Sequence, residues 1–67
     1  MKEEIQIDDK NSIEVLLFED GGSFFVEVIE WTKISDRKRS GKRKFCDKFV
    51  TKESAIEHYQ NTLTAWG

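Results

Sequence analysis

The sequence predicts an α+β domain, in which a three-stranded antiparallel β-meander packs against one C-terminal α-helix. Residues 23–34 form the longest stretch with strand-like alternation, and residues 12–19 alternate in the same way before an Asp-Gly-Gly sequence. From residue 52 onward, apolar residues recur instead at steps of three and four, which is the spacing of a helix with one buried side. The 67 residues make a single domain, residues 1–67.

The central predicted strand, residues 23–34, has one apolar side and one mixed side. Phe24, Val26 and Val28 project to the same side, because successive side chains of a strand point to opposite faces. The other side mixes aromatic, aliphatic and charged residues and includes Trp31. We expect the helix to cover the Phe24 side. The Trp31 side then stays partly exposed, unless another strand, a loop or the N-terminal segment covers it.

The chain before this strand contains a predicted strand and a tight turn. Residues 1–11 form either a frayed tail or a short edge strand, and the tail is favoured because only Ile5 and Ile7 alternate. Residues 12–19 form the first predicted strand. Asp20, Gly21 and Gly22 follow, and these residue types accept the backbone angles of tight turns. The sequence therefore predicts an antiparallel hairpin around this turn.

After the central strand, residues 35–41 are predicted to be a polar connection and residues 42–50 a third strand. Thr51 is a good helix N-cap, and Glu53 in the first turn suits the helix dipole. The helix is predicted over residues 52–65. The residues expected in the core, from the apolar faces of the central strand and the helix, are Val26, Val28, Ile56, Tyr59 and Leu63.

Charge is distributed unevenly along the chain, although the net charge is only −2. Residues 1–31 carry two basic and nine acidic residues, whereas residues 32–48 carry eight basic and two acidic residues. Clustered Lys and Arg at a hairpin tip neutralise phosphates and release counterions, and a two-stranded ribbon fits the DNA major groove. The alternative is that these charges neutralise the acidic strands of the chain itself.

The sequence contains no motif for catalysis, and we expect no enzymatic activity, no metal site and no cofactor. One His and one Cys cannot form a Cys/His zinc cage. Gly21 and Gly22 join two strands and do not open a helix, so they are not a phosphate-binding loop. No apolar run approaches the ~18 residues of a membrane span, and the first ten residues lack a signal-peptide core. We expect a cytoplasmic, reducing location.

Three features follow one another from residue 22 to residue 66: the aromatic strand SFFV, the basic turn of residues 37–44, and the run FVTKESA that opens the helix. In this order they resemble the N-terminal arm-site DNA-binding domain of phage and transposon tyrosine integrases. In that family a three-stranded sheet lies on the DNA major groove and the helix backs it. The resemblance implies an origin in a phage or mobile element. It also implies that Trp31, Lys33, Arg43 and Lys44 face the groove.

The sequence therefore predicts a small nucleic-acid-binding module, which binds double-stranded DNA through its basic hairpin and sheet face. The candidate contact residues are Trp31, Lys33, Arg37, Lys38, Arg39, Lys42, Arg43 and Lys44. The alternative is a protein-interaction module, which docks through its acidic N-terminal half or its exposed aromatic sheet face.

Overall fold

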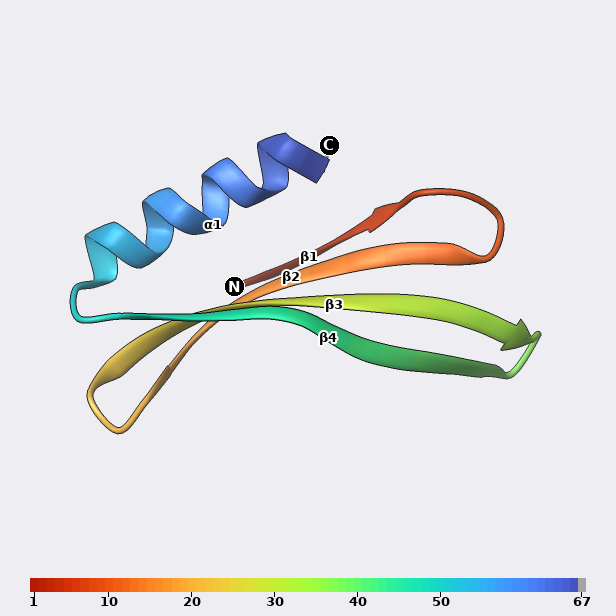
Figure 1. Cartoon of the computed structure of the whole chain (residues 1–67), viewed down its shortest axis with the longest axis horizontal. Helices are drawn as coiled ribbons and strands as arrows, with labels where there is room; N and C mark the ends of the chain where they lie inside the picture. Colours follow the sequence, from red (N-terminus) through yellow and green to blue (C-terminus); the bar gives the residue numbers. More distant parts are fainter. Residues whose placement is uncertain (67) are drawn as a thin grey trace.

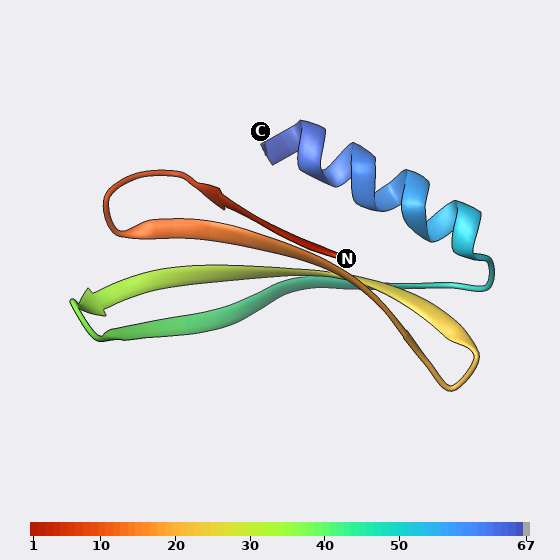
Figure 2. The same cartoon turned by 180° about the vertical axis from the view of Figure 1, so that it is seen from behind.

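The computed structural model describes residues 1–66, which form a four-stranded antiparallel sheet and one helix. The elements are β1 (Lys2–Gln6), β2 (Asn11–Asp20), β3 (Ser23–Ser35), β4 (Lys38–Phe49) and α1 (Lys52–Trp66). The strands lie side by side in chain order, with α1 across one face (Figure 1). The view from behind (Figure 2) likewise shows α1 on one side of the sheet and no described helix or strand on the other. The predicted α+β class is confirmed, but the number of strands was wrong.

The additional strand is β1, in the segment where the sequence favoured a frayed tail. It pairs along its whole length with β2 and forms one edge of the sheet. Met1 continues the pairing, because its amino group donates to the Leu17 carbonyl oxygen at 3.0 Å and its carbonyl accepts from Leu17 N–H at 2.8 Å. Ile5 is the one residue of β1 that is half-buried. The strand therefore depends on backbone pairing and shows almost no apolar alternation in the sequence.

The hairpin of β2 and β3 confirms the predicted turn. Asp20 lies opposite Ser23, so the loop between the strands consists of Gly21 and Gly22 alone. Their φ angles are 60° and 80°, a region that favours glycine. Two residues with positive φ match the right-handed twist of the strands on either side.

The hairpin of β3 and β4 is longer than predicted, and its connection is shorter. Residues 35–41 were expected to be a connection, yet β3 continues to Ser35 and β4 begins at Lys38. The turn is therefore only Asp36 and Arg37. Every residue of β4 except Phe49 is exposed. Residues 38–44 accordingly show no alternation of apolar and polar residues, which is the pattern that would have indicated a strand there. A register shift between Val28 and Ile29 further interrupts the regular pairing.

The core lies between α1 and the sheet. Its buried apolar residues come from β2, β3 and α1, and they are Ile13, Val15, Leu17, Val26, Val28, Ala55 and Tyr59. The predicted core residues Val26, Val28 and Tyr59 are thus confirmed, whereas Ile56 and Leu63 are only half-buried at its margin. The helix begins as predicted, because Thr51 Oγ1 accepts a hydrogen bond from Ser54 N–H at 3.3 Å.

Candidate functional site: the β3–β4 hairpin and the open face of the sheet

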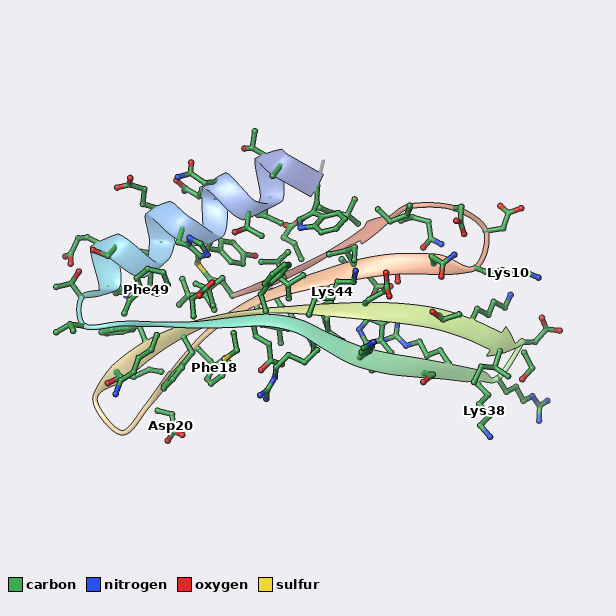
Figure 3. The ribbon with its side chains drawn as sticks, viewed as in Figure 1. Lys10, Phe18, Asp20, Lys38, Lys44 and Phe49 are labelled. Atoms are coloured by element: carbon green, nitrogen blue, oxygen red, sulfur yellow. The ribbon has the colours of Figure 1, made fainter. Side chains whose placement is uncertain are left out.

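The eight candidate contact residues all lie on the β3–β4 hairpin. Trp31 and Lys33 belong to β3, Arg37 to the turn, and the other five to β4. Figure 3 shows Lys38 at the turn and Lys44 farther along the same strand. β4 is the outer strand of the sheet and carries six basic residues and one acidic residue. The structure therefore gathers most of the basic residues on one edge.

Trp31 is already occupied by contacts within the chain. Its ring is half-buried, and the guanidinium carbon of Arg39 lies 4.1 Å from the ring centroid, a cation–π contact. Its Nε1 donates a hydrogen bond to Glu14 Oε1 at 3.1 Å. On β4, a Cβ at Gly41 would lie only 2.6 Å from the Trp31 ring, so this position has no room for a side chain. Because Arg39 covers one face of the ring, that face is not free to stack on a base.

Arg39 also joins the two edges of the sheet. Its Nη1 lies 3.1 Å from Glu4 Oε2, and the same carboxylate accepts a 2.7 Å hydrogen bond from Ser12 Oγ. The Ser12 hydroxyl lowers the pKa of Glu4 most, and Arg39 adds to the effect. These residues and Trp31 border a hollow of about 370 Å³ that extends to both neighbouring turns. Glu14 thus defines this end of the face together with Glu4 and Gly41, two residues that the sequence did not indicate.

Three further candidate cations are paired with acidic residues of the chain. Arg43 Nε lies 3.0 Å from Glu27 Oε2, and Lys44 Nζ lies 3.6 Å from Glu30 Oε2. Lys33 Nζ is 3.5 Å from Asp36 Oδ1 in the turn. Together with Arg39, four of the seven candidate cations therefore neutralise charges within the fold. This is the alternative role that the sequence left open for the basic stretch.

The remaining candidate cations are Arg37, Lys38 and Lys42. They are exposed, and within residues 1–66 no ion pair involves them. Lys48 has the same properties, although sequence reasoning had not included it. We call these four residues of the turn and β4 the basic edge. They are the cations of the β3–β4 hairpin that are most available to a partner.

The face of the sheet opposite α1 carries an apolar patch. It consists of Leu16 and Phe18 on β2 and Phe25 and Ile29 on β3, and we call it the open patch. The rings of Phe18 and Phe25 are stacked with centroids 5.4 Å apart. Phe18 is 39% exposed and lies on the side of the sheet away from α1 (Figure 3). This face is therefore partly exposed, which is one of the two outcomes that the sequence left open.

His58 links α1 to β4. Its Nε2 lies 3.1 Å from Asp47 Oδ2, and its ring packs on Phe49 with centroids 5.0 Å apart. No sequence signal indicated this pair, because its two members come from different elements. Beside it, a groove of about 330 Å³ between β4 and α1 includes the exposed residues Phe45 and Trp66.

Two further features concern residues 1–66 as a whole. They contain no group of three or more His, Cys, Asp or Glu side chains arranged to hold a metal ion. Their helix is neither long nor apolar enough to cross a membrane. No family model, curated protein or solved structure matches the chain.

Proposed function

We propose that the chain is a small non-enzymatic nucleic-acid-binding module that contacts phosphates through its basic edge. The observation that carries the proposal is that Arg37, Lys38, Lys42 and Lys48 are exposed and unpaired within residues 1–66. Cations that bind phosphates release counterions, and this release drives binding. A cation already paired with a carboxylate must first break that pair. The proposed contact surface is therefore limited to the basic edge and does not include the rest of the hairpin or the sheet face.

The dimensions of the basic edge suit a duplex. Lys38 and Lys48 are ten residues apart on one strand. At a rise of roughly 3.4 Å per residue, they are separated by about 34 Å, one turn of B-DNA. The resemblance to integrase arm-site domains also favours double-stranded DNA as the ligand. We expect contacts to the backbone of the duplex and no reading of bases by Trp31, because Arg39 covers its ring.

The proposal is tested by titrating the protein with a short DNA duplex at about 50 mM salt and following backbone amide shifts. We expect shifts in residues 36–48. Changing Arg37 and Lys38 together to Gln should weaken binding and reduce the salt slope by about one for each phosphate that is no longer neutralised. The free energy of unfolding should stay unchanged, because these residues have no ion pair to lose within residues 1–66.

The matched control changes Lys2 and Lys52 to Gln. This pair removes the same charge from β1 and from the start of α1, at the other end of the sheet from the turn that holds Arg37 (Figure 1). If the control weakens binding as much as the Arg37 and Lys38 variant, only net charge matters and the proposed interface is wrong. Absence of binding at about 50 mM salt would reject the nucleic-acid function altogether.

A second candidate function is protein interaction, and the open patch favours it. Contiguous apolar side chains that are rimmed by polar residues mark interaction sites. In this chain the helix covers the other face of the sheet, and no described element covers this one. The other docking surface considered for this function, the acidic N-terminal half, is less available, because several of its carboxylates already bind residues of the chain itself. These are Glu4, Glu14, Glu27 and Glu30.

A further inference from the structure

The groove of about 330 Å³ between β4 and α1 has aromatic residues on both sides and an apolar base. Phe45 of β4 is 57% exposed and Trp66 of α1 is 37% exposed, whereas Val28 of β3 is buried. Ala65 adds a methyl group next to Trp66. Ligand sites are typically apolar hollows with a few polar groups that fix the orientation of the ligand. The groove is therefore suited to an apolar or aromatic part of a ligand.

The polar groups of this groove include a carboxylate that lacks a full set of donors. Asp47 Oδ2 lies 3.1 Å from His58 Nε2, and within residues 1–66 the other carboxylate oxygen accepts no hydrogen bond. An ionised carboxylate can only accept hydrogen bonds. A purely apolar side chain in the groove would remove water from Asp47 and supply no donor, which is unfavourable. The ligand should therefore combine an apolar ring with a hydrogen-bond donor.

The charges outside the groove favour an anion next to that ring. α1 ends above the middle of the sheet, and β4 continues past it to the β3–β4 turn (Figure 1). Lys42 and Lys48 of the basic edge are each three residues from Phe45, roughly 10 Å along the strand. Lys42 lies opposite Glu30, on the face that carries Phe45. Glu30 is itself paired with Lys44 at 3.6 Å, so Lys42 remains available to a phosphate.

We propose that this groove binds one unpaired base of a nucleic acid whose phosphates lie on the basic edge. Every base has a face that stacks on aromatic side chains. Cytosine also has an amino group that donates to a carboxylate, whereas thymine has the O4 oxygen at the same position. A basic peptide would supply donors too, but Lys42 and Lys44 outside the groove would repel it. The inference rests on the nucleic-acid function proposed above and assigns it an unpaired base, cytosine in preference to thymine.

The test compares DNA duplexes of one sequence by fluorescence anisotropy at about 50 mM salt. One duplex is fully paired, one contains an extra unpaired cytosine, and one contains an extra abasic position at the same place. We expect the duplex with the unpaired cytosine to bind about tenfold more tightly than the other two, because only its base can stack in the groove. An unpaired thymine at that place should give a smaller gain, because its O4 oxygen meets the Asp47 carboxylate.

Phe45→Thr, which keeps strand propensity, should remove most of the gain from the unpaired cytosine and leave binding of the paired duplex unchanged. Phe18→Thr is the matched control, because Phe18 is an exposed phenylalanine of β2 on the other face of the sheet, and it should keep the gain. Asp47→Asn should reduce the ratio of cytosine to thymine binding, because an amide both donates and accepts. Circular dichroism should show that all three variants fold.

Three results would overturn the inference. The first is equal affinity for the paired duplex and the unpaired cytosine, which is also expected if the groove binds a side chain of a partner protein. The second is the same gain from the abasic position, which would mean that only the deformed backbone is bound. The third is a gain that Phe18→Thr removes and Phe45→Thr does not. Binding of the paired duplex without any gain rejects the groove and leaves the nucleic-acid function intact, whereas no binding of any duplex rejects both.

Discussion

The two faces of the sheet are stabilised in different ways, although β2 and β3 supply the central part of both. Under α1, Ile13, Val15 and Val26 are each at most 1% exposed, and Tyr59 of the helix packs over them. On the open face, Trp31 is held by Arg39 and Glu14, with further ion pairs around it. The face under α1 is thus stabilised by burial beneath the helix, and the open face by contacts among its own side chains.

This difference shows how a short chain can stabilise a sheet that has only one helix. Burial of apolar surface contributes roughly 25 cal/mol per Å² and responds little to salt. The open face instead uses charged pairs, which salt screens and which are worth at most about 1 kcal/mol each when exposed. The two faces should therefore respond differently to mutation, salt and pH, and four predictions test this, from the largest effect to the smallest.

Tyr59→Ala should lower the free energy of unfolding by about 2–4 kcal/mol, because it removes a buried aromatic ring from the core. Phe18→Ala on the open face should cost clearly less, since Phe18 is 39% exposed. Denaturant unfolding of both variants, at low concentration to avoid association, measures the difference. Equal losses would mean that both faces are stabilised by burial to a similar extent.

Gly41→Ala should lower stability by about 1–3 kcal/mol, because the new methyl group overpacks the Trp31 ring. The control is the same change in a Trp31→Ala background, where the ring is absent. A double-mutant cycle should then show strong coupling between the two positions. If Gly41→Ala costs the same in both backgrounds, Trp31 is not fixed against β4 as described.

Changing Arg43 and Lys44 to Gln should lower stability by up to about 1 kcal/mol for each broken ion pair, because Glu27 and Glu30 lose their partners. Unfolding curves at low salt and at about 1 M salt test this, since high salt should remove most of the loss. Unchanged or increased stability would show that these cations do not stabilise the fold. They would then be available to phosphates, like those of the basic edge.

The smallest effect concerns the turn between β1 and β2. Asp8 Oδ1 accepts hydrogen bonds from the Asn11 side chain at 3.0 Å and from the N–H groups of Lys10 and Asn11 at 2.8 and 2.9 Å. These bonds, with that of the Asn11 side chain largest, lower the pKa of Asp8 in the folded state. The carboxylate therefore stabilises the fold above its unfolded pKa, and this contribution is lost as pH falls through the folded value.

Asp8→Asn should accordingly make the free energy of unfolding less dependent on pH below about pH 4. Asp9→Asn is the control, because within residues 1–66 Asp9 takes no part in the hydrogen bonds that close the turn. Thermal unfolding between about pH 2 and pH 5 provides the measurement. The same pH dependence in both variants would mean that the Asp8 hydrogen bonds do not stabilise the turn.

The sequence by itself determined the parts of the fold that bury apolar surface. Alternation in residues 12–19 and 23–34 predicted β2 and β3, because one face of each strand had to leave water. Gly21 and Gly22 predicted the hairpin between them, and Thr51 predicted the start of α1. These signals are local, since each depends on the periodicity or backbone angles of neighbouring residues.

Only the tertiary structure decided the edges of the sheet and the charged part of the candidate site. β1 and the first half of β4 have few buried side chains, so their strand character comes from pairing with a neighbouring strand. Arg39 and Glu4 are 35 positions apart and belong to opposite edge strands, yet they meet over Trp31. No local pattern specifies such a pair, because an exposed charge finds its partner through the folded shape of the sheet.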